Sequence, residues 1–345
     1  MQQDVLFQAL AGREGAVGVI TLNRPTVLNS LNHTMINAMF QQLTTWEKDP
    51  TIKAVVIVGA GERAFCAGGD LRFTYELYQQ KSDKITAFFK DEYRLNSLIY
   101  HYKKPYIAFL NGITMGGGVG VSIHGSHRIA TERLLFAMPE TSIGLFPDVG
   151  GTYFLPRLPH HIGYYLGLTG ARLQADECVA FGIAQHKMLA TSYTAFITLL
   201  AETPLKQEAH QVVTALIEQF QEPIDSSPLI KESALIGSFF AKNSLEAIMQ
   251  QLANASHPVL ISALDTLQKK SPTSLKVTLS ALQKGATSTF DECMAQEFRL
   301  VSHFLHHHDF FEGIRAIIID KDQQPKWQPP KLAEVTEELV NTYFS

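Results

Sequence analysis

The segment PETSIGLFPDVGGTYFLP (139–156) contains two carboxylates that could carry out acid–base chemistry. Glu140 follows Pro139 and Asp148 follows Pro147, among Gly and large apolar residues that are typical of a protein core. Proline restricts the local backbone and so helps to fix where each acid points. Two carboxylates that face one pocket suit acid–base catalysis, because burial and mutual repulsion separate their pKa values. The alternative is structural, with an Asp in a Pro-Asp turn and a Glu near a helix start.

Two glycine-rich turns, AFCAGGD (64–70) and NGITMGGGVG (111–120), follow predicted strands. Glycine lets backbone N–H groups approach a ligand without a Cβ in the way, and a helix that starts within the GGG adds its dipole. Two such turns directed at one point would form an oxyanion hole for a thioester or ester carbonyl. The alternative is a pair of tight turns with no ligand. Neither turn fits GxxxxGK[ST], which argues against a P-loop for nucleotides.

A third carboxylate lies on a predicted helix over residues 85–102. Glu92 falls on the same stripe of this helix as the apolar residues Phe88 and Leu95. A carboxylate on a core-facing stripe is costly unless it is paired, hydrogen-bonded or open to a ligand cavity. Glu92 therefore either belongs to a site, or lies at the edge of the stripe, partly exposed or paired with Arg94.

Other residues of reactive type carry weaker signals. The run 306–308 holds three His residues, but neighbours on a helix point to different faces, which is poor geometry for a metal site. Cys66 has no His in its motif and is interpreted as a small buried hydrophobe. Asp70 is predicted to cap the helix that follows it. Arg24, in NRP, either meets a phosphate or pairs at the surface.

An α/β fold is the framework that must position these groups. Short β-branched or aromatic runs predict buried strands at 17–22, 54–59, 106–110 and 127–130. Between the first two strands, apolar residues at helical spacing predict a helix: Met35, Met39, Leu43 and Trp46. Strands that alternate with helices indicate a largely covered sheet.

After about residue 200 the pattern becomes helical. The stretch AIII (316–319) is the exception that reads as a strand, 221–228 reads as a linker, and 323–330 reads as an extended strap. We therefore expect an α/β core over residues 1–200 and a mainly helical region over 201–345, which would cover the active site.

The overall composition is that of a compact globular protein, with 46% apolar and 18% charged residues. A net charge of −4 with scattered Lys and Arg predicts no nucleic-acid partner. The N-terminus lacks a secretory pattern, no apolar run reaches membrane-spanning length, and three scattered cysteines suit a reducing compartment. These features predict a cytoplasmic protein without a membrane partner.

In their order and intervals, the motifs resemble the crotonase superfamily of acyl-CoA enzymes. The segments that carry the resemblance are NRP (23–25), LNSLN (28–32), AFCAGGD, NGITMGGGVG, PETSIGLFPDVGG and LTGARLQADECVAFGIA (168–184). The later segments SPTSLKVTL (271–279) and HDFFEGIRAIIIDKDQQPKW (308–327) are similar to one branch, the 3-hydroxyisobutyryl-CoA hydrolases. The resemblance implies a spiral of ββα units with C-terminal helices over the acyl site.

The resemblance also implies roles for individual residues. It makes the backbone N–H groups of Ala67 and Gly117 the oxyanion hole, Glu140 the catalytic carboxylate and Asp148 its catalytic partner. Glu92 would line the acyl pocket. The other implied substrate-binding residues are Gly68, Gly69, Asp70 and Gly116.

Position 120 separates the branches of the superfamily. Hydratases typically carry a second catalytic Glu two residues past the GGG, where this chain has Gly120. The resemblance therefore implies hydrolysis of a 3-hydroxyacyl-CoA thioester in valine breakdown, without a metal or other cofactor. Glu140 would activate water or attack the carbonyl itself, and both routes stay open. The alternatives are a hydratase or isomerase of the same superfamily and a non-catalytic acyl-CoA-binding protein. The acyl chain preferred and the oligomeric state stay open, a homo-oligomer included.

Overall fold

The computed structural model describes residues 3–205 and 208–345. The chain forms two compact units that are interleaved along the sequence. Unit 1 comprises Met1–Gly69, Asp91–Phe136 and Leu173–Ser227, and unit 2 comprises Asp70–Lys90, Ala137–Arg172 and Pro228–Ser345. The division at residue 200 marks a change of secondary structure, because the described elements from residue 209 onward are all helices. As a division into domains it stays a prediction.

Unit 1 is built on two sheets. The larger has the order β1-β2-β3-β5-β7-β10, and the smaller has the order β4-β6-β8-β9. The strands are β1 (Val5–Gly12), β2 (Gly15–Leu22), β3 (Ile52–Gly59), β4 (Ala64–Cys66), β5 (Tyr106–Leu110), β6 (Ile113–Met115), β7 (His127–Thr131), β8 (Leu135–Ala137), β9 (Leu173–Gln174) and β10 (His186–Met188). The four strands predicted within the α/β core are confirmed. From β2 to β10 the neighbours in the larger sheet are parallel, which suits their near-continuous apolar sequences.

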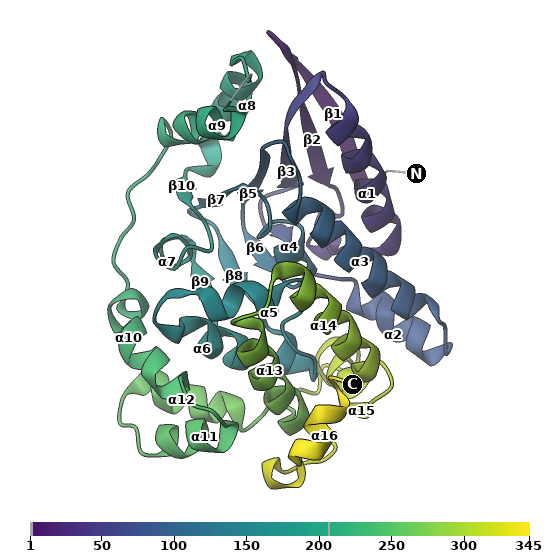
Figure 1. The fold of residues 1–345 in the computed structure, drawn as a ribbon, viewed down its shortest axis with the longest axis vertical. Coiled ribbons are helices and arrows are strands. Elements are labelled where there is room, and N and C mark those ends of the chain that lie inside the picture. The colour runs from purple at the N-terminus through teal and green to yellow at the C-terminus, as the bar shows by residue number, and fades with distance from the viewer. Residues whose placement is uncertain (1–2, 206–207) are drawn as a thin grey trace. The chain divides into compact units, whose positions relative to one another are not determined.

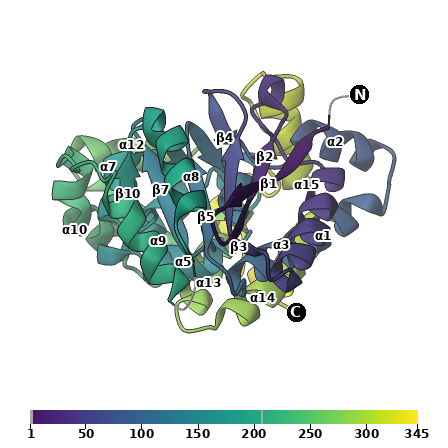
Figure 2. The ribbon, with the colours of Figure 1, turned by 90° about the horizontal axis from the view of Figure 1, so that it is seen from above.

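Helices cover the larger sheet. The helix predicted from apolar spacing is confirmed as α1 (His33–Lys48), whose buried residues include Met35, Met39, Leu43 and Trp46. Two later helices, α8 (Tyr193–Glu202) and α9 (Ala209–Glu218), lie beside the larger sheet (Figure 2). Their buried residues form one core cluster with side chains of β2, β3, β5 and β7. The remaining helices of unit 1 are the short α4 (Gly117–Gly120) and α7 (Ala175–Ala180). A further helix, α3 (Lys84–Tyr100), begins in unit 2 and ends in unit 1.

The first strand of the chain was not predicted. β1 pairs antiparallel with β2 at the edge of the sheet, from Val5 opposite Leu22 to Gly12 opposite Gly15. Most of its side chains are at least partly exposed, so the apolar run that marks a buried strand is missing from its sequence.

Unit 2 is mainly helical (Figure 1). Its short 3₁₀ helix Glu140–Ile143 carries one of the candidate catalytic residues. Its helices are α2 (Leu71–Gln79), α5 (Gly151–Phe154), α6 (Ile162–Thr169), α10 (Pro228–Phe240), α11 (Leu245–Ala253), α12 (Pro258–Leu267), α13 (Pro272–Gly285), α14 (Phe290–Phe304), α15 (His308–Ile314) and α16 (Glu337–Thr342). No helix among the described residues is long and apolar enough to cross a membrane.

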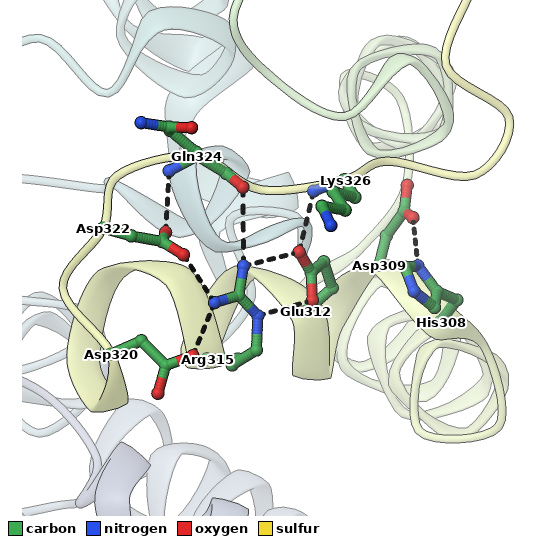
Figure 3. A network of polar contacts seen from close by, with 8 residues as sticks. All are labelled: His308, Asp309, Glu312, Arg315, Asp320, Asp322, Gln324 and Lys326. Carbon is green, nitrogen blue, oxygen red and sulfur yellow. Dashed lines mark hydrogen bonds and ion pairs between the residues drawn. The ribbon is translucent and has the colours of Figure 1, made fainter.

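The strand expected at AIII is wrong, because Arg315–Ile319 form a turn of π-helix that continues α15. Figure 3 shows the reason: Arg315 binds Glu312 on α15 at 2.8 Å, and also Asp320 at 2.6 Å and Asp322 at 2.7 Å, which lie just beyond the turn. These ion pairs join both ends of the turn to one guanidinium. Glu312 also accepts the N–H of Lys326 at 2.8 Å, which ties the predicted strap to α15.

Candidate active site

The two glycine-rich turns lie against each other within unit 1. A Cβ built on Gly68, whose φ is +113°, would lie 3.7 Å from the backbone N of Gly117. A Cβ built on Gly117 would lie 3.4 Å from the backbone N of Gly69. Since α4 begins at Gly117, the first amide of that helix faces the same region as the AFCAGGD turn. The geometry therefore offers two amides from separate turns at one place.

The amides that are available differ from those implied by the resemblance. The N–H of Ala67 donates to the carbonyl of Leu28 at 3.0 Å, so it is already used within the fold. Among the described residues, the N–H groups of Gly69 and Gly117 have no hydrogen-bond partner. The structure thus corrects one implied donor: Gly69, rather than Ala67, carries the N–H that the first turn leaves available.

The buried side chain of Glu92 lies directly beside Gly117. It lies on α3 and is 2% exposed, and a Cβ on Gly117 would overlap its Oε1. The alternative of an edge position paired with Arg94 is wrong, because Arg94 is exposed and pairs with Asp91 at 3.2 Å. Burial of this carboxylate against a glycine leaves no room for a side chain at position 117.

Glu140 is the centre of a second group of polar residues, in unit 2. It is the first residue of the 3₁₀ helix and is 6% exposed. Burial, and then the charge of Asp148, raise its pKa well above the ordinary value, while the charge of Lys270 opposes the rise. Its Oε2 has no hydrogen-bond partner among the described residues. A buried carboxylate with a raised pKa suits proton transfer.

Lys270 supports the turn that carries Glu140. Its Nζ donates to the hydroxyl of Thr141 at 2.9 Å and to that of Ser142 at 2.7 Å, so it binds the two residues that follow Glu140. Burial lowers the pKa of Lys270 to about 7, and the charge of Glu140 raises it. The sequence analysis did not single out this residue.

Asp148 lies in the buried turn that follows Pro147 and is 5% exposed. Its carbonyl accepts the N–H of Gly151 at 2.7 Å. A further carboxylate that the sequence analysis missed, Glu297 on α14, accepts N–H groups of Gly150 and Thr152 in the same turn. Its position on α14 shares a stripe with buried apolar residues, the same signal that marked Glu92. Asp148 and Glu297 both raise the pKa of Glu140.

The remaining candidates have local roles. Asp70 caps α2, as predicted, by accepting the N–H of Phe73 at 3.2 Å. Cys66 is buried, and burial raises the pKa of its thiol to about 12, so a thiolate nucleophile is disfavoured. Arg24 donates to the carbonyl of Ser30 at 2.8 Å and pairs with Asp4 at 3.8 Å. Within the described residues, no group of three His, Cys, Asp or Glu side chains could hold a metal ion.

Known proteins agree with the resemblance seen in the motifs. The sequence model of the enoyl-CoA hydratase/isomerase family matches residues 17–344. The chain belongs to this family. It is 44% identical to the 3-hydroxyisobutyryl-CoA hydrolase, mitochondrial, of Homo sapiens, over 99% of this chain and 89% of the relative. The Bos taurus protein of the same name is 45% identical over 99% of this chain and 89% of the relative.

Solved structures of the family confirm the crotonase-like fold. A carnitinyl-CoA dehydratase from Mycobacterium thermoresistibile is 37% identical, with a TM-score of 0.91, over 100% of this chain and 97% of the other. An enoyl-CoA hydratase from Rhodobacter sphaeroides is 34% identical, with a TM-score of 0.86, over 99% of this chain and 97% of the other. The expected α/β fold with a helical C-terminal region is therefore correct.

The comparison also corrects one expectation. The relatives that match over nearly the whole chain carry "mitochondrial" in their names, so the cytoplasmic location expected from composition is wrong. Scattered cysteines suit any reducing compartment, so composition does not separate the cytoplasm from another reducing compartment.

Proposed function

We propose that this protein hydrolyses a short 3-hydroxyacyl-CoA thioester, 3-hydroxyisobutyryl-CoA, to the free hydroxy acid and CoA. The curated relatives named as hydrolases of this thioester support the assignment, at 44–45% identity over 99% of this chain. Such a reaction belongs to valine breakdown. It calls for no cofactor, because water and the residues of the chain supply every group that the chemistry needs.

The residue at position 120 is the observation that favours hydrolysis over hydration. Hydration of a double bond by this family uses a second Glu where this chain has Gly120, a buried residue of α4. A glycine offers neither a base nor an acid there. Glu140 remains as the carboxylate for the reaction, and one carboxylate with an oxyanion hole is sufficient for acyl transfer.

In the proposed mechanism, the N–H groups of Gly69 and Gly117 hold the thioester oxygen as it becomes negative. Glu140 either takes a proton from the attacking water or attacks the carbonyl to form an anhydride, which water then cleaves. The C–S bond breaks, and the thiolate of CoA takes up a proton. Asp148 binds the 3-hydroxyl of the substrate, orients Glu140 or protonates the thiolate, and Glu92 lines the acyl pocket.

The resemblance to the family implies that two backbone amides and two acids act on one thioester. Gly68, Asp70 and Gly116 belong to the same proposed binding region. The partner is the acyl-CoA substrate, and neither nucleic acid nor a membrane enters the proposal.

A panel of short acyl-CoA esters tests the proposal, with thiol release and enoyl absorbance followed in parallel. Hydrolysis predicts thiol release that is fastest with 3-hydroxyisobutyryl-CoA. The alternative activity, hydration or isomerisation of an enoyl-CoA, predicts loss of enoyl absorbance from crotonyl-CoA without thiol release. Tight binding without any product would support a non-catalytic acyl-CoA-binding protein and refute both activities.

A further inference from the structure

A fully buried carboxylate in unit 2 has no role in the proposed reaction. Glu297 is 0% exposed and lies on the buried stripe of α14. Its Oε2 accepts the N–H of Gly150 at 2.7 Å, and its Oε1 accepts the N–H of Thr152 at 3.0 Å and the hydroxyl of Thr152 at 2.6 Å. Three hydrogen bonds therefore join one carboxylate to a turn that is about 145 residues earlier in the chain.

That turn begins at Asp148 and has a strained backbone. Val149, which directly follows Asp148, has a φ of +50°, and Gly150 has a φ of +87°. The left-handed region costs a glycine little, but a β-branched residue rarely adopts it. Such a conformation typically persists only where the surrounding structure enforces it. The bonds from Glu297 to Gly150 and Thr152 supply that restraint immediately after Val149.

The charges in this region are coupled. Burial raises the pKa of Glu297 to about 8, the three hydrogen bonds oppose the rise, and the charge of Asp148 adds to it. Glu297 in turn raises the pKa of Glu140. The charged groups that act on Glu140 are Asp148, Lys270 and Glu297, so a change at position 297 also reaches Glu140.

We propose that Glu297 is a positioning residue, which holds the strained turn after Asp148 so that this carboxylate keeps its direction. The proposal rests on the catalytic role proposed for Asp148. Glu297 itself takes no part in the reaction. It acts through the backbone of Gly150 and Thr152.

The substitution Glu297→Gln tests the proposal, because it keeps the size of the side chain and replaces one acceptor oxygen by an amide donor. That donor faces an N–H group of the turn, so the turn loses a restraint. Misplacement of a catalytic group by 1 Å costs about 100-fold in rate, so kcat should fall by that order while KM stays within about threefold. Removing the charge of Glu297 should also move the acid limb of kcat/KM to lower pH, since Glu297 raises the pKa of Glu140.

A matched control lies on the same helix. Glu292 accepts the N–H and the hydroxyl of Thr289 at the exposed start of α14, so Glu292→Gln removes a similar Glu–Thr contact away from Asp148. It should lower the melting temperature but leave kcat and the pH profile unchanged. If Glu297→Gln lowers only the melting temperature, as the control does, the contact is merely structural and the proposal is refuted.

A second pair of variants decides the matter if Glu297→Gln does not fold. Thr152→Val removes one of the three donors, and Thr152→Ser retains it. The proposal expects a lower kcat for Thr152→Val and near-normal turnover for Thr152→Ser. Equal turnover in these two variants would overturn it.

The variant Asp148→Asn separates this proposal from the proposed function. Impaired turnover in Asp148→Asn together with normal kcat in Glu297→Gln would refute only the role of Glu297. Normal turnover in Asp148→Asn would instead refute the catalytic role of Asp148, and the positioning role would fall with it.

Discussion

We expect a methyl group at position 117 to disable the proposed oxyanion hole. The Cβ of Gly117→Ala would overlap Oε1 of the buried Glu92 and lie 3.3 Å from Cδ1 of Leu31. It would also lie 3.4 Å from the backbone N of Gly69, the second proposed donor. The methyl would therefore displace the side chain of Glu92 and crowd the two proposed donor amides.

The size of the effect follows from the donors that are lost. Loss of one oxyanion-hole hydrogen bond typically costs about 3 kcal/mol of barrier, or 100- to 1,000-fold in kcat. The methyl affects two donors, so we expect the upper part of that range. The interaction strengthens in the transition state, so KM should change by less than about tenfold.

The assay is thiol release from 3-hydroxyisobutyryl-CoA under saturating conditions. The control is Gly182→Ala, at an exposed glycine with a φ of +78° where a Cβ meets nothing within 4 Å. This control strains the backbone and should lower stability without affecting kcat. A Gly117→Ala variant with near-normal kcat would refute the assignment of this amide, whatever its melting temperature.

Two further predictions concern Lys270 and Cys66. Lys270→Met removes the positive charge that opposes the raised pKa of Glu140. The acid limb of kcat/KM should therefore move to higher pH, and turnover should fall most at acidic pH. An unchanged pH profile would exclude this electrostatic role of Lys270. Thr141→Val removes a hydrogen bond of Lys270 but retains its charge, and so should leave the limb in place. Cys66 is buried, and burial raises the pKa of its thiol to about 12. Cys66→Ala should therefore keep turnover within about threefold and lower the free energy of unfolding, measured in urea, by at most ~2 kcal/mol. Loss of turnover in a well-folded Cys66→Ala variant would contradict the interpretation of Cys66 as a buried hydrophobe.

Local patterns in the sequence were sufficient to predict four strands of the larger sheet. The strands at 17–22, 54–59, 106–110 and 127–130 lie within or coincide with β2, β3, β5 and β7. Their apolar runs reflect burial on both faces, which a sequence shows directly. The strand β1 and the π-helical turn after α15 were missed, because the first depends on edge pairing and the second on ion pairs to Arg315.

Residues of the candidate site could be predicted where the pattern that marks them lies in one short stretch of sequence. Glu92 was found because its helix has a clear apolar stripe, and the same reasoning applied to α14 finds Glu297. Lys270 gave no such signal, since its hydrogen-bond partner Thr141 is 129 residues away in the sequence. The choice between Ala67 and Gly69 depends on which N–H already donates a hydrogen bond within the fold. A sequence motif does not show hydrogen bonds between separate segments of the chain.

The measurement that tests the central claim most directly compares Glu140→Gln with the native protein, for both turnover and binding of 3-hydroxyisobutyryl-CoA. The variant keeps the shape of the side chain but can neither activate water nor attack a carbonyl. We expect thiol release to fall by about 100- to 10,000-fold while the dissociation constant of the CoA ester stays within about tenfold. Near-normal thiol release from Glu140→Gln would contradict the account, because the reaction would then proceed without the carboxylate on which it depends.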